Sequence, residues 1–244
     1  MTPLNAAEAF QYSTTDTLLA GLFDGDATAG DALDKGDFGL GIFNGLDDEL
    51  LVLDGAAYRL TADRTAVRAD DDAGLPFYTV CTFDDAAAKP IDVEATAYDT
   101  FKAELDAKLD GLNYPHAIKI EGTFRRMIAR STHKEQKSYA PIGEVMERRV
   151  IMDFEDVSGV IVAFRMPSYL AGINTAGYHF HFISDDRTAG GHVMDFDIDA
   201  VTVKAMKLTN LDIALPDSHA FEAVDFSIDR SQDLKNAHRL DHGH

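Results

Sequence analysis

The sequence predicts an α/β protein of the α+β type, in which β-strands joined by turns predominate and helices are few and short. Short runs of β-branched and aromatic residues recur along the chain between clusters of Gly, Asp and Asn, as is typical of strands and turns. One segment, 97–110, instead has helical periodicity, because Phe101, Leu105 and Leu109 recur every four residues and Gly111 follows. These two patterns together predict the fold class.

A break in the pattern at 112–116 predicts two domains. The run Asn-Tyr-Pro at 113–115 interrupts the elements on either side of it, and 244 residues suffice for two small domains. We therefore expect an N-terminal α/β domain over 1–112. A C-terminal β-rich domain, which carries a polar tail, is expected over 113–244.

The individual elements follow from turn signals and capping residues. In the first domain the sequence predicts helices at 15–23 and 29–35, and strands at 37–44, 49–53, 57–61 and 77–83. In the second it predicts a short helix at 142–148 and strands at 117–120, 123–129, 159–165, 178–183, 192–196 and 200–208.

The charge balance limits the partners of the protein. There are 42 acidic and 22 basic residues, which give a formal net charge of −20. Such a surface repels the phosphate backbone of nucleic acids and the anionic headgroups of membranes, so we expect neither as a partner. An anionic small molecule that binds here needs a local positive centre.

We expect neither a membrane span nor a signal peptide, because no apolar run is long enough to span a membrane and the N-terminal residues lack a basic region followed by an apolar one. Its one cysteine, Cys81, permits no internal disulfide and stands in an apolar run, where a small buried residue is expected. These features favour a cytoplasmic location.

Three histidines in the run GYHFHFISDDRTAGGHVMD form a candidate metal site. On a strand at 178–183, His179 and His181 lie on one face, and the aromatic residues between them lie on the other. A hairpin returning through the loop at 184–191 brings His192 beside His181. Three neutral imidazoles leave a coordination position open, as in catalytic zinc sites.

Spacing alone leaves alternatives to this interpretation. A histidine on a strand is more often an ordinary core or surface residue, although three on one hairpin favour a site. Imidazole also suits copper, iron and nickel, so the spacing does not fix the metal.

Five motifs, in order along the chain and including the histidine block, resemble the alpha-acetolactate decarboxylase family. They are FQYSTTDTLLAGLFDG, GDFGLGIFNGLDDELLVLDGAAYRL, LPFYTVCTF, IARS and the histidine block. The resemblance runs from about Phe10 to Arg230. It implies two α/β domains, each on a mixed sheet, and a homodimer. It also implies Zn²⁺ as the cofactor.

The resemblance also implies roles for single residues. His179, His181 and His192 match the zinc ligands, Arg130 an active-site arginine, and Glu49 an active-site carboxylate. The chain departs from the family at three positions: Lys35 stands for a histidine, Ile42 for a threonine, and His238 for a second active-site glutamate. His238 is therefore a candidate acid or metal contact whose role differs from the family pattern.

The expected function is decarboxylation of 2-acetolactate to acetoin and carbon dioxide. Zinc would stabilise the enediolate, Arg130 hold the carboxylate, and Glu49 deliver a proton. One rival is a cupin-like dioxygenase or isomerase, but cupins place a Glu ligand soon after the HxH pair, and 182–187 contains none. A non-catalytic metal-binding module is the other.

Overall fold

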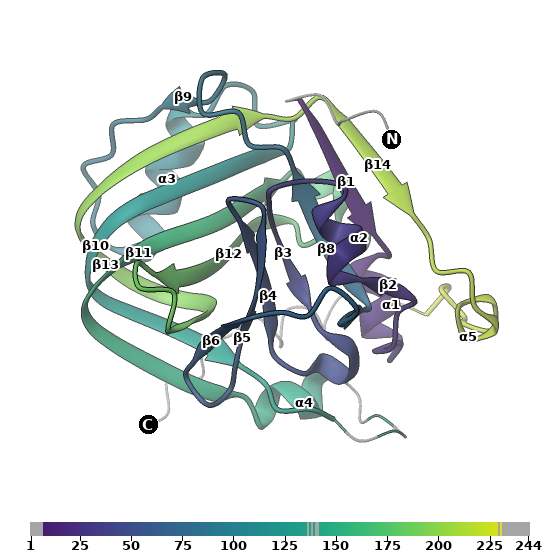
Figure 1. Ribbon diagram of the computed structural model, residues 1–244. Helices are drawn as coiled ribbons and strands as arrows, with labels where there is room; N and C mark the ends of the chain where they lie inside the picture. The colour runs from purple at the N-terminus through teal and green to yellow at the C-terminus, as the bar shows by residue number, and fades with distance from the viewer. Residues whose placement is uncertain (1–6, 136, 138, 140–141, 229, 231–244) are drawn as a thin grey trace.

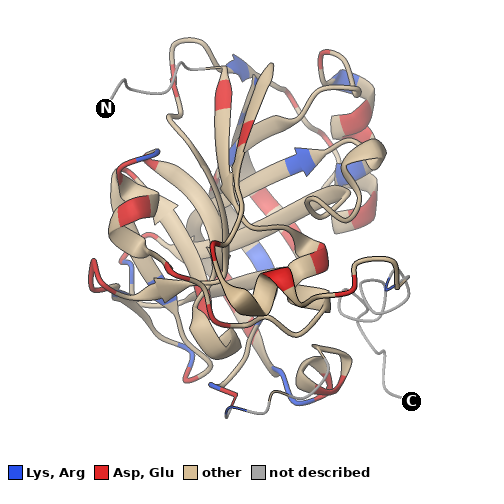
Figure 2. Ribbon diagram, turned by 90° about the vertical axis from the view of Figure 1, so that its right-hand side faces the viewer, with Lys and Arg blue, Asp and Glu red and all other residues tan. Residues whose placement is uncertain are grey.

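Two β-sheets packed face to face form the body of the protein in the computed structural model (Figure 1). The structure describes residues 7–228 and 230, apart from 136, 138 and 140–141. His238 therefore lies outside the described residues. Among those residues, no helix is long and apolar enough to cross a membrane. In the ribbon of Figure 2, acidic positions are spread over many segments of the fold, with fewer basic positions between them.

The first sheet has seven short strands. Their spatial order is β14 (Asn210–Ala214), β1 (Glu8–Tyr12), β8 (Phe77–Cys81), β3 (Phe38–Ile42), β4 (Glu49–Leu53), β5 (Ala56–Leu60) and β6 (Ala66–Arg68). Neighbours are antiparallel except for β1 and β14, which run parallel. The sheet is thus mixed and mainly antiparallel, and the predicted α+β fold is confirmed.

The second sheet is built from long strands and curves back on itself. Its order is β10 (His116–Ser131), β11 (Val150–Met166), β12 (Gly177–Ser184), β13 (Gly190–Lys207) and β9 (Lys89–Pro90). Because β10 also pairs with β13, four of these strands close into a ring. A separate two-stranded ribbon joins β2 (Ala27–Thr28) and β7 (Gly74–Leu75).

Glycines allow these strands to bend instead of ending. The sequence predicts two strands at 117–120 and 123–129, whereas β10 is continuous, with Gly122 at φ +151° in its centre. A Cβ on Gly122 would lie 2.1 Å from the Ala200 carbonyl oxygen of β13. The pairing of β10 with β13 also shifts register beside this point, which marks a bulge that increases local curvature.

The helices are short apart from one. They are α1 (Thr15–Leu19), α2 (Ala29–Leu33), α3 (Tyr98–Lys108), α4 (Ile142–Glu147) and α5 (His219–Glu222), with 3₁₀ turns at Asn44–Leu46 and Ser168–Leu170. Each helix expected from the sequence is present but shorter. The Thr14 hydroxyl caps α1, and α2 begins with a capping box between Thr28 and Asp31.

Helix α3 fills the inside of the curved sheet. Phe101, Leu105 and Leu109, the residues with helical periodicity, pack against inward-facing aromatics that include Phe180 and Phe182 of β12. Burial of these large side chains removes apolar surface from water and stabilises the curved shape of the sheet around α3. The outer face of the same sheet is thereby left to meet the seven-stranded sheet.

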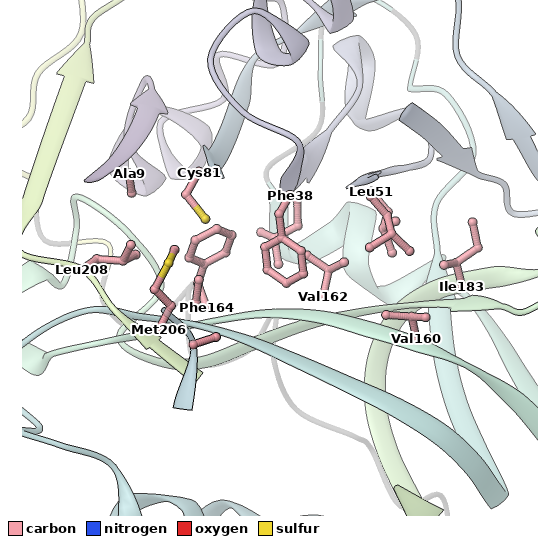
Figure 3. Packing of buried hydrophobic residues seen from close by; sticks show 14 of the residues in the cluster. Ala9, Phe38, Leu51, Cys81, Val160, Val162, Phe164, Ile183, Met206 and Leu208 are labelled. Carbon is pink, nitrogen blue, oxygen red and sulfur yellow. The ribbon is translucent and has the colours of Figure 1, made fainter. Parts of the chain in front are cut away.

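A second apolar cluster joins the two sheets (Figure 3). Phe38, Leu51 and Cys81 come from the seven-stranded sheet, and Val162 and Phe164 face them from β11. All five are buried, so the two sheets share one continuous core. This core fixes the position of β4 relative to β12, which matters for the site.

The division at residue 112 stays a prediction. Two strands cross it: β14, from the second half, pairs with β1, and β9, from the first half, pairs with β13. Helix α3 also precedes residue 112 but packs inside the second sheet.

Candidate metal centre and active site

Strand register brings the three histidines together. His181 of β12 lies directly opposite His192 of β13, and His192 lies opposite Arg130 of β10. Residues directly opposite each other on neighbouring strands point to the same face. Arg130, His192 and His181 therefore form a row across three strands, with His179 two residues away on β12.

The imidazoles converge on one point. His181 Nε2 lies 3.2 Å from His179 Nε2 and 3.2 Å from His192 Nδ1. One ligand atom from each ring lies within 4.8 Å of the others, which suits a single metal ion. The predicted grouping of His179, His181 and His192 is present in the structure.

A backbone carbonyl fixes the orientation of the central ring. His181 Nδ1 lies 2.7 Å from the Leu50 carbonyl oxygen on β4, and it is the donor when Nε2 faces the other histidines. This tautomer leaves the Nε2 lone pair free for a metal ion. Burial lowers the pKa of His181 to about 3, so the ring is neutral at physiological pH.

Glu49 and Arg130 meet beside the histidines. Glu49 is the first residue of β4 in the seven-stranded sheet, and Arg130 stands near the end of β10 in the other. Arg130 Nη1 donates to Glu49 Oε1 at 2.6 Å, and Glu49 Oε2 lies 3.5 Å from His181 Nε2. The two sheets therefore contribute opposite walls of one site.

Burial changes the acid–base properties of this pair. Desolvation raises the pKa of Glu49 to about 7, although the charge of Arg130 acts in the opposite direction. Desolvation likewise lowers the pKa of Arg130. Both side chains are at least nine-tenths buried. Carboxyl groups with such raised pKa values are typical of functional sites.

The turn before β4 is tied to the end of β10. Thr132 Oγ1 donates to the Leu46 carbonyl oxygen at 2.5 Å, and the Asp48 N–H donates to the Thr132 carbonyl oxygen at 3.0 Å. Leu46 and Asp48 both adopt left-handed backbone conformations, with φ of +52° and +70°. Strained backbone of this kind is often found at functional sites. This turn places Glu49 next to Arg130.

A small, mainly apolar pocket opens in front of these groups. It is lined by Thr15, Leu18, Leu19, Gly41, Ile42, Leu46, Glu49, Phe77, Arg130, Ile142, Met146, Thr175, His179 and His192. The predicted residues His179, His192, Arg130 and Glu49 thus face one space. His181 lies behind them and is fully buried.

Sequence reasoning missed most of the apolar wall. Leu18 of α1 and Met146 of α4 come from helices predicted only as elements, and Phe77 comes from a strand that carries no functional signal. Nothing in their local pattern distinguishes them from core residues. Their role arises from the packing of distant segments.

The loop before β12 is held by a buried polar network. Asn174 Nδ2 donates to Gln11 Oε1 and Thr79 Oγ1, and Asn174 Oδ1 accepts from the Thr175 N–H. Gln11 also donates to the Ile173 carbonyl oxygen. These bonds attach the loop to β1 and β8 of the seven-stranded sheet, and they fix Thr175 at the pocket.

Two of the departures from the family pattern fall in different surroundings. Ile42 lines the pocket, as expected for a residue near the metal site. Lys35 places its ammonium group 4.4 Å from the centre of the Phe10 ring, outside the pocket.

Comparison with known proteins identifies the family. The model of the alpha-acetolactate decarboxylase family matches residues 9–228. The chain belongs to the alpha-acetolactate decarboxylase family. It is 35% identical to the enzyme of that name from Bacillus licheniformis over 91% of this chain and 88% of the relative. It is 37% identical to the one from Lactococcus lactis over 86% of this chain and 88% of the relative.

Solved structures agree with the family. The crystal structure of alpha-acetolactate decarboxylase from Bacillus subtilis strain 168 superimposes with a TM-score of 0.89 at 33% identity, over 95% of this chain and 99% of the other. The two-sheet architecture is therefore that of the decarboxylase family.

Proposed function

We propose that this protein decarboxylates 2-acetolactate to acetoin and carbon dioxide at a zinc ion held by His179, His181 and His192. The observation that carries the proposal is the placement of the Glu49–Arg130 pair against the three imidazoles in one pocket. Family membership supplies the substrate, since its members bear the name of this reaction.

The histidine donors fit a zinc ion. Their ligand atoms are close enough to share one ion, and the hydrogen bond from His181 to the Leu50 carbonyl oxygen sets the required tautomer. When bound there, zinc would supply a Lewis acid that stabilises the negative charge developing on the substrate oxygens as carbon dioxide leaves.

Arg130 provides the positive centre that an anionic substrate needs in a protein of charge −20. Within the described part of the chain only Nη1 is engaged, by Glu49. Its other N–H donors remain for the substrate carboxylate, which a guanidinium binds in a planar, two-point geometry. This contact orients the carbon–carbon bond that breaks.

Glu49 is the candidate proton donor. Loss of carbon dioxide leaves an enediolate, which must take a proton at carbon to become acetoin. A carboxyl group whose pKa is raised to about 7 is protonated in a substantial fraction of the molecules at neutral pH, whereas an ordinary glutamate is almost fully ionised. Because Glu49 approaches from one wall, delivery to one face of the enediolate gives one enantiomer. We keep His238 as a candidate partner in this step.

The apolar wall of the pocket suits the rest of the substrate. Leu18, Phe77 and Met146 present hydrocarbon surface, which matches the two methyl groups of acetolactate and excludes water. Excluding water strengthens the charge interactions made by Arg130 and Glu49.

The homodimer and the cytoplasmic location remain predictions. The family resemblance supports the dimer, and the single buried Cys81 fits a reducing compartment. Sedimentation equilibrium of the purified protein tests the first, since a mass of twice 26.7 kDa is expected.

The test of the function is an acetoin assay. Zinc-loaded protein is incubated with racemic 2-acetolactate, and acetoin is measured by chiral gas chromatography. We expect one acetoin enantiomer in large excess, formed much faster than in buffer, and loss of this rate when a chelator removes the metal. Acetoin formation no faster than the spontaneous rate would refute the proposal.

A further inference from the structure

Two residues that line the pocket carry a neutral hydroxyl, Thr15 and Thr175. They differ in how the hydroxyl is placed. Thr15 Oγ1 is completely buried and has no hydrogen-bond partner among the described residues. The Thr175 hydroxyl also makes no hydrogen bond within the described part of the chain, but it is not a fully buried atom. Thr175 therefore brings to the pocket a hydroxyl that has no hydrogen-bond partner among the described residues.

Thr175 borders two hollows of the protein. Thr175 and His192 line both the pocket and a larger groove of about 720 Å³ that runs along α3. The residue as a whole is only 7% exposed, so its side chain is largely enclosed by protein. Thr175 is therefore close to any ligand that fills the pocket.

The position of Thr175 is fixed from behind. Its N–H donates to Asn174 Oδ1 at 2.6 Å, and Asn174 is itself held by Gln11 at 2.7 Å and Thr79 at 2.9 Å. All three supporting side chains are at most 1% exposed. A side chain supported in this way loses little conformational freedom when it binds a ligand.

We propose that the Thr175 hydroxyl is a substrate-contacting group that binds an oxygen atom of the 2-hydroxy-3-keto acid. This inference rests on the proposed function. The substrate carries four oxygen atoms in a pocket whose remaining lining is mainly apolar, and an enclosed oxygen without a partner costs free energy. Thr175 supplies one such partner besides Arg130 and the metal site.

The contact also bears on specificity. A site that hydrogen-bonds a substrate oxygen discriminates against analogues that lack it, because the protein hydroxyl is then left unpaired. Ile42 lines the same pocket and offers only hydrocarbon. The choice between oxygen-rich and hydrocarbon ligands is thus expected to depend on Thr175.

The test compares Thr175→Val with Thr175→Ser. Valine keeps the shape of threonine without the hydroxyl, and serine keeps the hydroxyl. We expect kcat/KM for acetolactate to fall about tenfold in the valine variant and to stay within about threefold of wild type in the serine variant. The Tm of Thr175→Val should remain within about 2 °C of wild type, since the hydroxyl has no partner to lose.

Thr17→Val is the matched control. Thr17 is also buried, on α1, but its hydroxyl is bonded to Thr14 Oγ1 at 2.8 Å and it does not line the pocket. This variant should lower Tm and leave kcat/KM unchanged. A fall in kcat/KM without a fall in Tm indicates a contact with substrate, whereas a fall in Tm without a fall in kcat/KM indicates a contribution to folding.

Binding of a non-reactive analogue separates this inference from the proposed reaction. The compound 2,3-dihydroxy-2-methylbutanoate has no ketone, so it cannot decarboxylate as a β-keto acid. Calorimetry should show about tenfold weaker binding to Thr175→Val than to wild type or Thr175→Ser, even if wild type makes no acetoin. Equal affinity in all three proteins, or equal losses in the valine and serine variants, would overturn the role of the hydroxyl.

Discussion

The two sheets contribute to the site in different ways. The ring formed by β10 to β13 supplies four of the site residues, and three of them, Arg130, His192 and His181, are direct neighbours across strands. The seven-stranded sheet supplies Glu49 and the Leu50 carbonyl oxygen from one short strand. The metal centre is therefore set by strand register, whereas the acid–base pair is set by packing between sheets.

This difference predicts different responses to mutation. Loss of a histidine ligand from the ring should remove the metal and abolish activity. Damage on the seven-stranded sheet should leave the metal bound but impair the reaction. Loss of a contact that joins the two sheets should mainly lower the free energy of unfolding. The following experiments test this order, beginning with the largest expected effect.

The largest effect is expected for His181→Ala. It removes the ligand at the centre of the triad, so we expect less than one zinc per two chains and a fall in kcat of about a thousandfold or more. Mass spectrometry of the metal content and the acetoin assay check this. His219→Ala, on the exposed α5, should keep both metal and activity. Full zinc occupancy in His181→Ala would contradict the assigned centre.

Glu49→Gln should separate the reaction from metal binding. Glutamine keeps the size of the side chain but donates no acidic proton, so kcat should fall about 10² to 10⁴-fold while zinc content stays unchanged. The exposed Glu222→Gln serves as the control. Near-normal turnover in Glu49→Gln would remove Glu49 from the proton transfer.

Asn174→Ala should weaken the attachment of the ring's loop to the seven-stranded sheet. The change leaves Gln11 Oε1 and Thr79 Oγ1 without their bonds to Asn174, and we expect a loss of about 2–4 kcal/mol in the free energy of unfolding. Urea denaturation measures it. Asn210→Ala, at an exposed position, should change stability by less than about 0.5 kcal/mol. Equal stabilities would show that the network does not hold the sheets together.

The smallest effect is expected at Asp85, which follows the seven-stranded sheet's β8 and contacts Lys204 and Lys119 of the ring. Hydrogen bonds from these lysines lower the pKa of the Asp85 carboxyl. A lowered carboxyl pKa stabilises the fold above the unfolded value of 3.8, and this stabilisation is lost as pH falls through the folded pKa.

Asp85 is half exposed, so solvent screens the pair. We expect Asp85→Asn to cost less than about 1 kcal/mol at pH 7. Denaturation curves at pH 7 and below pH 3 should show this difference shrinking towards zero in acid. If the stability difference between Asp85→Asn and wild type grew in acid, the pKa of Asp85 could not be lowered by folding.

The sequence predicts local features better than distant ones. The alternation at 178–183 correctly assigned opposite faces to the histidines and the aromatic residues, because both faces of β12 carry clear signals. The helical periodicity likewise correctly predicted that Phe101 and Leu105 form the buried face of α3, and Leu109, at the end of the helix, is buried as well. In each case a short segment contains all the necessary information.

Long-range contacts could not be found in this way. Arg130 and Glu49 are 81 residues apart, and only the family resemblance indicated that they act together. The parallel pairing of β1 with β14 joins the two ends of the chain, and neither strand was predicted. The first half of β11 was also missed, because Asp153, Glu155 and Asp156 make it resemble a loop although it is an exposed part of the strand.

The central claim is that both sheets build a single zinc site. A crystal structure of the zinc-loaded protein with 2,3-dihydroxy-2-methylbutanoate, recorded at the zinc absorption edge, tests it most directly. We predict one anomalous peak bonded to His179, His181 and His192, with the ligand carboxylate on Arg130 and Glu49 beside it. A peak bound by other residues, or a ligand that contacts neither Arg130 nor Glu49, would contradict the account.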